Sequence, residues 1–392
     1  MVTAVILALI VGNIVRYAGF TCLNSTVSLL FKKITTLFSM VATHLVFCAV
    51  ITGISGIGDA ASFGKIGGRL IGRMMITYFI AMTIMVLVGI PMGLAALGNS
   101  SSESDAFTDL LNLVLDMIPE NLISPFAIDN DLQVIVLAIF IGVAMLLLGD
   151  KANRVKEFIS GVGEIVNKMM MLVCKLLPVF VFLGICDLII SDRLAEVAKV
   201  SSILLISFIA SIINILIVMI RTRIVTGRSL KEIFAPQIPS FMINLTTSSQ
   251  ISALPESMKC CKEGYKIDEK LVDFGLPLGI VVYMPNGAIM LGAMTWVLGT
   301  MSHGPADPMT IFKIIFVSIV VAIAAPPIPG SAFAIMPILF SACGTDLSMM
   351  PLAVIVASTF GYLLPAMNGF CLQEEILMAA TKADMIKIRG KR

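Results

Sequence analysis

Long apolar runs separated by short polar segments dominate this chain. A straight helix needs about 20 apolar residues to cross a bilayer. Runs that approach or exceed this length begin at the N-terminus and recur at about 34–56, 74–98, 132–149, 169–190, 201–220, 272–299 and 351–380. The pattern predicts an all-α polytopic membrane protein with eight transmembrane helices. Pro285-Asn286-Gly287 interrupts the run at 272–299, and we expect a broken span there because Pro removes a helix donor and Asn-Gly favours a turn.

Two further apolar segments, 233–262 and 311–345, have arms too short to span a bilayer. The first turns at the polar stretch 246–252 and the second at the Pro/Gly-rich stretch 326–331. Both are expected to be re-entrant helical hairpins. Broken backbone at membrane depth is tolerated only where it is buried in protein or lines a wet cavity, so the pair predicts a solute site between the two tips.

The distribution of basic residues predicts the orientation. No Lys or Arg occurs between Arg73 and Lys151, and the loop 99–131 is acidic. We therefore expect this loop outside, and the basic loops before Arg73 and after residue 150 in the cytoplasm. The basic segment 387–392 predicts a cytoplasmic C-terminus. The first hairpin is bracketed by basic segments and the second follows a nearly uncharged loop. They are therefore expected to enter from opposite sides, as in the inverted repeats of many secondary transporters.

Composition narrows the class further. Hydrophobic residues make up 58% and charged residues 13% of the 392 residues, against about 25% charged residues in soluble domains. A net charge of +2 offers no nucleic-acid footprint, and two His residues provide neither a zinc site nor a catalytic triad, so we expect no enzyme. The N-terminus lacks a charged leader region and is expected to be the first span rather than a removed signal peptide. The expected location is a bacterial plasma membrane, with the lipid bilayer and a small-molecule solute as partners.

Several motifs together resemble those of a known transporter family. They are Ser55–Asp59 with Gly64–Gly68, Asn121–Pro125 leading into Asp131–Gly142, Ser248-Ser249 before Leu254–Met258, Leu276–Gly279, and Ile328–Ser331. No single motif is specific, but their order and spacing resemble those of the dicarboxylate/amino acid:cation symporters, the family that includes the glutamate transporters. The resemblance covers nearly the whole chain.

The resemblance implies a homotrimer in which a mobile transport domain slides like an elevator against a static scaffold. Its implied boundaries are 1–57 for scaffold spans one and two, 58–98 for span three of the transport domain, 99–199 for the outer loop and scaffold spans four and five, and 200–392 for the rest of the transport domain. No cofactor is expected beyond sodium as a coupling ion.

The resemblance and the two hairpin tips supply candidate site residues, and the acidic pair of the last span adds Glu374 and Glu375. For the solute they are Ser248, Ser249, Gln250, Pro329, Gly330, Ser331 and Asn368. For a coupling sodium ion or proton they are Tyr78, Gly279, Asn286, Asn368, Glu374 and Glu375.

Departures from the family pattern fall at these sites. When the last span is aligned on Asn368, Gly361, Leu364 and Leu372 stand where the family has an amino-group-binding Asp, a carboxylate-binding Arg and a sodium-binding Asp. In span three, Ala81 and Met82 replace hydroxyl residues of another sodium site. An acidic side chain of a solute would therefore lack a bidentate partner. We expect weak or no binding of glutamate and aspartate, and a neutral polar amino acid or a small monocarboxylate as the better substrate.

The adjacent acids Glu374 and Glu375 allow two interpretations. Buried acids in a membrane mark an ion or proton path by default, whereas acids beyond the cytoplasmic boundary would form a solvated helix end. The sequence thus favours cation-coupled symport, with sodium or a proton, of a small amino acid or carboxylate by an elevator mechanism. The alternative is an uncoupled facilitator or channel on the same fold.

Overall fold

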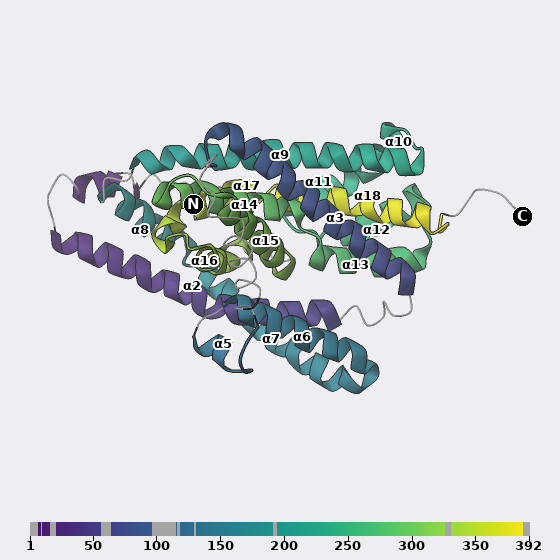
Figure 1. Cartoon of the computed structure of the whole chain (residues 1–392), viewed down its shortest axis with the longest axis horizontal. Coiled ribbons are helices and arrows are strands. Elements are labelled where there is room, and N and C mark those ends of the chain that lie inside the picture. The colour runs from purple at the N-terminus through teal and green to yellow at the C-terminus, as the bar shows by residue number, and fades with distance from the viewer. Residues whose placement is uncertain are drawn as a thin grey trace, which may run out of the picture.

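The protein is an elongated bundle of helices (Figure 1). The computed structural model describes residues 7–8, 10–15, 21–55, 64–95, 115, 118–128, 131–190, 194–325 and 331–386. In this part of the chain the only β pairings are two isolated bridges, Ala95 with Ala306 and Ile267 with Ile386. The α-helices are α2 (Thr21–Ser55), α3 (Gly64–Gly89), α5 (Ser124–Ala127), α6 (Asp131–Leu148), α7 (Asn153–Cys174), α8 (Leu177–Ile190), α9 (Leu194–Thr226), α10 (Leu230–Phe234), α11 (Ile238–Thr247), α12 (Leu254–Lys259), α13 (Glu269–Val282), α14 (Pro285–His303), α15 (Pro308–Ala324), α16 (Ser331–Cys343), α17 (Met350–Phe360) and α18 (Leu364–Lys382).

Four helical segments of the described chain are long and apolar enough to cross a membrane, or five if one bent pair is counted as a single span. The four are Gly67–Met92, Gln133–Val173, Lys199–Thr226 and Glu269–His303. The several apolar helices bear out an all-α membrane protein, but the expected total of eight spans is not reached among the described residues. The expected first span lies largely outside them.

The expected broken span is present as two helices. Helix α13 ends at Val282 and α14 begins at Pro285, so that Tyr283 and Met284 form the break. Pro285 has no N–H to continue the ladder of α13, and it is well placed in the first turn of α14, where that donor is not needed.

Both expected hairpins fall on pairs of short helices in contact. Helices α11 and α12 have 10 and 6 residues, with Ser248–Ala253 between them. Helices α15 and α16 have 17 and 13 residues. The tip of this second pair, 326–330, lies outside the described residues, and Pro329 and Gly330 belong to it. The expected approach of the two tips therefore also lies outside them. A straight helix of 17 residues or fewer falls short of the bilayer thickness.

Three details of the sequence prediction are wrong. The last run, 351–380, is two helices bent by 58° between Phe360 and Leu364 rather than one. The run 169–190 is divided between α7 and α8, because Pro178 removes a donor just after α7 ends. The basic segment expected to be a loop after residue 150 is the amphipathic helix α7, whose Val166 and Met170 are buried.

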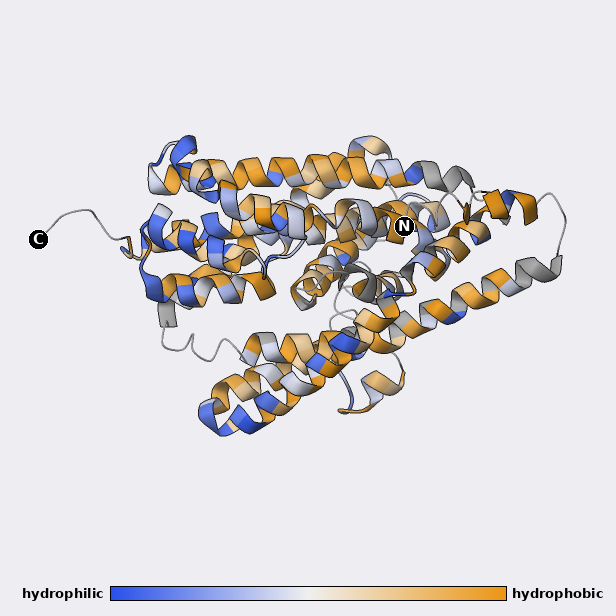
Figure 2. Cartoon of the chain, turned by 180° about the vertical axis from the view of Figure 1, so that it is seen from behind, coloured by the Kyte–Doolittle hydropathy of each residue, from blue (hydrophilic) through white to orange (hydrophobic). Residues whose placement is uncertain are grey.

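The helices form two packing groups. Helix α2 packs with α6, α7 and α8, and Lys156 of α7 donates a hydrogen bond of 3.2 Å to the carbonyl of Ser55 at the end of α2. Helix α9 packs with α3, α14, α17 and α18. Figure 2 shows the middle of the bundle as mainly hydrophobic, with hydrophilic residues concentrated at the end that carries the C-terminus. At that end the backbone N–H of Asp268 donates to Met385 and ties α13 to the segment after α18.

Candidate functional site

The break between α13 and α14 is held by Tyr78 of α3. The Tyr78 hydroxyl accepts a hydrogen bond of 2.7 Å from the backbone N–H of Met284 and donates one of 3.1 Å to the carbonyl of Val282. Backbone groups freed by a break cannot form hydrogen bonds to water inside a bilayer, so each needs a hydrogen-bond partner within the protein. Tyr78, which is fully buried, supplies two such partners with one side chain.

A chain of three buried amides lies next to this break. The backbone N–H and the side-chain Nδ2 of Asn286 donate to Oδ1 of Asn368 at 3.1 and 3.0 Å, and Nδ2 of Asn214 donates to Oδ1 of Asn286 at 3.1 Å. The three residues come from α14, α18 and α9 and are at most 1% exposed. We call Asn214, Asn286 and Asn368 the amide cluster. Oδ1 of Asn214 has no hydrogen-bond partner among the described residues, so the cluster retains an oxygen that a cation or a donor group can use.

Sequence reasoning identified Asn286 and Asn368 but missed Asn214. A signal was present, because Asn214 is the only amide residue within the apolar run 201–220. A buried amide in a spanning helix needs a partner, which makes such a residue a candidate for an interhelical contact.

Beside the break, Leu372 of α18 packs against Gly279 of α13. A Cβ atom on Gly279 would lie 2.1 Å from Cδ1 and 3.0 Å from Cγ of Leu372. The space next to this candidate cation residue is therefore filled by a hydrocarbon side chain. The Gly279 carbonyl already accepts from the N–H of Tyr283.

Gly279→Ala is expected to destabilise the protein by about 1–3 kcal/mol, because the buried Leu372 has no room to move away from the added methyl group. Thermal melting in detergent measures the loss. The double variant Gly279→Ala/Leu372→Ala should lose much less stability than the sum of the losses of the two single variants. Additive losses would show that the two residues do not share this space.

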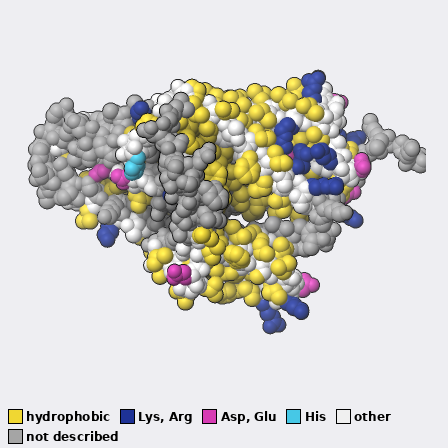
Figure 3. Space-filling model, viewed as in Figure 1, with side chains coloured by type: hydrophobic (Ala, Val, Ile, Leu, Met, Phe, Trp, Pro, Cys, Tyr) yellow, Lys and Arg dark blue, Asp and Glu magenta, His cyan; other side chains and the backbone are white. Residues whose placement is uncertain are grey.

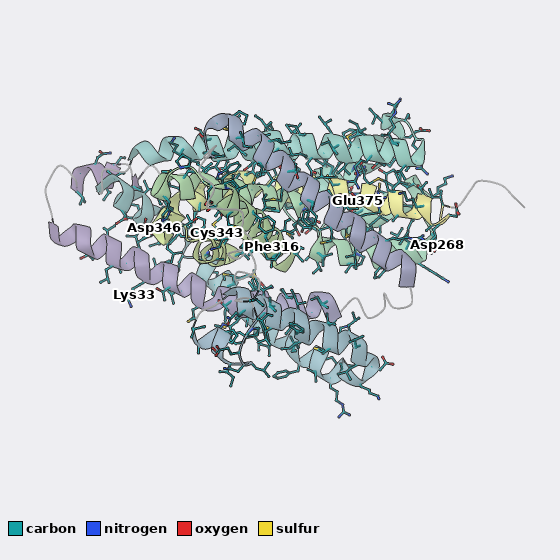
Figure 4. The ribbon with its side chains drawn as sticks, in the orientation of Figure 1. Lys33, Asp268, Phe316, Cys343, Asp346 and Glu375 are labelled. Carbon is teal, nitrogen blue, oxygen red and sulfur yellow. The ribbon has the colours of Figure 1, made fainter. Side chains whose placement is uncertain are left out.

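Glu375 lies in a charged cluster where α3 crosses α18 (Figure 4). Its carboxylate accepts a hydrogen bond of 2.6 Å from the Thr77 hydroxyl and lies 3.2 Å from Nε of Arg73 and 3.5 Å from Nη1 of Arg221. Arg221 also donates to the Thr77 hydroxyl at 2.8 Å. Glu375 is fully buried, whereas the side chains of Arg73 and Arg221 are 12% and 23% exposed. The carboxylate therefore has two guanidinium partners.

Glu374 is equally buried but has only neutral partners among the described residues. Thr222 of α9 bonds its Oε2 at 2.7 Å, and Nε2 of Gln237 lies 3.4 Å from Oε1. Successive residues on a helix point about 100° apart, which separates the two acids despite their adjacency. The interpretation of the pair as a solvated helix end is wrong, because both side chains have 0% exposure.

The tip of the first hairpin rests near the bend between α17 and α18. Ser248 adopts a left-handed conformation with φ of 52°, and its hydroxyl donates to the carbonyl of Tyr362 at 3.4 Å. The Ser249 hydroxyl accepts from the N–H of Ser252 at 3.3 Å. Gln250 is buried, and its Oε1 has no hydrogen-bond partner in the part of the chain that the structure describes. This tip therefore offers one unpaired amide oxygen beside hydroxyl groups already bonded to the backbone.

Gln373 of α18 ties this hairpin to the last helix. Its Nε2 reaches Ser240 of α11 at 2.8 Å and Ser257 of α12 at 3.4 Å, so that both arms are held. Sequence reasoning missed this contact.

Tyr78, Asn286 and Asn368 are thus brought together, with Gly279 one turn before the break. Glu374 and Glu375 lie about 9 and about 10.5 Å further along α18 than Asn368, from the rise of about 1.5 Å per residue. Ser331 is the first residue of α16. The described residues contain no group of three or more His, Cys, Asp or Glu arranged to hold a metal ion. The amide, hydroxyl and carbonyl oxygens around the break are of the kind that suits hard cations.

The sequence was compared with protein families and with known proteins, and both comparisons point to membrane transporters. Residues 1–370 match the model of the sodium:dicarboxylate symporter family. A C4-dicarboxylate transport protein of Acidovorax ebreus (strain TPSY) is 26% identical over 288 residues, covering 68% of this chain and 63% of that protein. C4-dicarboxylate transport protein 1 of Pseudomonas aeruginosa (strain UCBPP-PA14) is 24% identical over 333 residues, covering 82% and 73%.

The chain spans less than two thirds of the Acidovorax protein, at 63% of its length. Bacterial transporters as relatives, together with the long apolar helices, identify an integral membrane protein. A symporter family also agrees with the expectation of a transporter rather than an enzyme. The resemblance inferred from the motifs is confirmed: the chain belongs to the sodium:dicarboxylate symporter family.

Proposed function

We propose that the chain is a secondary transporter that carries a small carboxylate solute across a bacterial plasma membrane in symport with a cation. The observation that carries this proposal is the break of α13 and α14 packed against α18 through the amide cluster. Discontinuous helices that meet inside a membrane are typical of solute and ion sites in secondary transporters. Family membership supports the same function.

A carboxylate is favoured over an amino acid as the solute. The relatives are named as C4-dicarboxylate transport proteins, and Gly361 offers no carboxylate to the amino group of an amino acid. The neutral polar amino acid expected from the sequence is therefore replaced by a carboxylate. Helix N-termini present free N–H groups and a partial positive charge, which suit a carboxylate group. We place the solute between the first hairpin tip, with Ser248, Ser249 and Gln250, and Asn368, with Pro329, Gly330 and Ser331 on the other side.

Solute counterflow in proteoliposomes tests the substrate class. Vesicles loaded with unlabelled succinate should take up labelled succinate. Loading with aspartate or glutamate should give little exchange, because Gly361 offers no carboxylate to the amino group of these solutes. Monocarboxylates and neutral amino acids complete the panel. Exchange of aspartate as fast as that of succinate would contradict this assignment, and an absence of exchange with every solute would contradict a carrier.

We assign the coupling cation to Glu374 rather than Glu375. Glu375 is already balanced by Arg73 and Arg221, whereas Glu374 has only Thr222 and Gln237 as partners among the described residues. The Thr222 hydroxyl has one proton but lies near two acceptors, the Val218 carbonyl at 2.8 Å and Glu374. A protonated Glu374 would complete this set of bonds, which supports a proton, whereas the family name supports sodium. Uptake driven separately by each gradient distinguishes them.

We further propose the homotrimer, elevator motion and boundaries implied by the family. Helices α3, α9, α14 and α18 pack together and α2 packs with α6–α8, which supports a division into a transport domain and a scaffold. Basic residues gather at the C-terminal end of the bundle (Figure 3), which supports a cytoplasmic C-terminus. The second candidate function is an uncoupled facilitator, favoured by Leu372 in place of a sodium-binding carboxylate.

A further inference from the structure

A basic cavity of about 350 Å³ opens between the beginning of α3 and the end of α18. Its lining residues are Arg69, Gly72, Arg73, Ile76, Ala379, Lys382 and Ala383. Three of these seven residues are cationic and none is acidic. The cavity lies at the C-terminal end of the bundle and is separate from the amide cluster. Its charge suits an anionic ligand.

Two of the three cations have no counter-charge among the residues that the structure describes. Arg73 is engaged by Glu375 and also donates to Sδ of Met378 at 2.6 Å. Arg69 and Lys382 are exposed and have no ion-pair partner in the described part of the chain. The two side chains reach the cavity from different helices, α3 and α18, so an anion held by both would bridge them.

A glycine helps to create the hollow. A Cβ atom added to Gly72 would meet no atom within 4 Å, and the same holds for Gly68, one turn earlier on α3. A larger side chain at Gly72 would therefore extend into open space without disturbing the helix packing.

Next to the cavity, the outer face of α3 is apolar and exposed. Ile76, which lines the cavity, is 53% exposed, and Phe79 and Leu87 on the same face are 63% and 64% exposed. Figure 3 shows this change from basic to apolar surface, with a broad hydrophobic surface bordered by Lys and Arg side chains. A free inorganic anion or a dicarboxylate would use only the basic part. An amphipathic ligand uses both parts.

We propose that this cavity binds the headgroup of an anionic phospholipid, with the phosphate between Arg69 and Lys382 and the acyl chains along Ile76 and Phe79. Basic pockets between transmembrane helices on the cytoplasmic side are suited to such headgroups. The cavity is at the small end of the ligand-site range of about 300–1,000 Å³, which fits a headgroup better than a whole lipid. A lipid held here bridges α3 and α18, a role separate from solute transport.

Native mass spectrometry of the purified transporter tests the proposal. Phosphatidylglycerol and phosphatidylcholine with identical acyl chains are titrated onto the protein. Phosphatidylglycerol should bind preferentially. The variant Arg69→Gln/Lys382→Gln should bind it about thirtyfold more weakly, since each basic residue contributes about 1 kcal/mol near anionic lipid and 1.4 kcal/mol is a factor of ten. Gly72→Leu should also weaken binding, because it fills the cavity without removing charge.

The control is Arg223→Gln/Lys231→Gln, which removes two exposed charges at the same end of the protein but outside the cavity. It should bind phosphatidylglycerol like the parent. Parental binding by both cavity variants, or equal binding of the two lipids by the parent, would overturn the proposal. Displacement of the lipid by succinate or inorganic phosphate alone would overturn it in favour of a small-anion site.

Discussion

Glu374→Gln is expected to abolish gradient-driven uptake of the solute while leaving the fold intact. The side chain is buried and has neutral partners, so Gln can occupy the same space and keep a hydrogen bond to Thr222. The variant loses only the ability to bind a proton or to contribute a charge to a sodium site. Uptake into proteoliposomes with an imposed sodium or proton gradient should fall to the level seen without a gradient.

Counterflow provides the control for this variant. Exchange of unlabelled for labelled solute needs no net cation movement, so Glu374→Gln can retain exchange while losing accumulation. Gel filtration should show an unchanged oligomer. A variant that accumulates solute as well as the parent would remove Glu374 from the coupling mechanism.

Glu375→Gln, by contrast, is expected to lower stability substantially. Breaking a fully buried ion pair costs about 3–5 kcal/mol, and the partial exposure of Arg73 and Arg221 reduces this to about 2–3 kcal/mol by solvent screening. The unpaired guanidinium groups, rather than the missing carboxylate, cause most of the loss. Thermal melting in detergent, followed by size-exclusion chromatography, measures the difference.

Glu374→Gln is the matched control for this experiment, since the same chemical change occurs one residue away in an equally buried position. It should melt much closer to the parent. Replacing Arg73 and Glu375 by apolar residues, as in Arg73→Met/Glu375→Leu, should recover stability relative to Glu375→Gln, because only the more exposed guanidinium group, that of Arg221, then lacks its carboxylate. Identical melting of the two Gln variants would contradict the charge cluster.

The backbone was predicted best where the residues that cause a break or a turn lie within that segment of the sequence. Pro285-Asn286-Gly287 encodes the break within its own residues, and the short apolar arms of the first hairpin are read directly from their lengths. The bend before α18 was not predicted because its apolar run continues through Gly361. A Cβ there would lie 2.2 Å from the Ala357 carbonyl oxygen, a constraint that hydropathy does not record.

Side-chain partners were harder to predict because they depend on how each helix is rotated. Arg73 and Arg221 were interpreted as basic flanks that orient the protein, yet both reach Glu375 across separations of 302 and 154 residues. Asn214 reaches Asn286 from another helix in the same way. The adjacent acids Glu374 and Glu375 were treated as one pair, although helical geometry gives them different neighbours. Local sequence patterns do not determine these rotations.

Gradient-driven accumulation of labelled succinate in proteoliposomes tests the proposed cation-coupled carboxylate symport most directly. With equal external and internal cations, the solute should only equilibrate. With an inward sodium or proton gradient, internal succinate should rise above the external concentration and fall again when an ionophore collapses that gradient. Equilibration at the same level with and without both gradients would contradict coupling and leave an uncoupled facilitator.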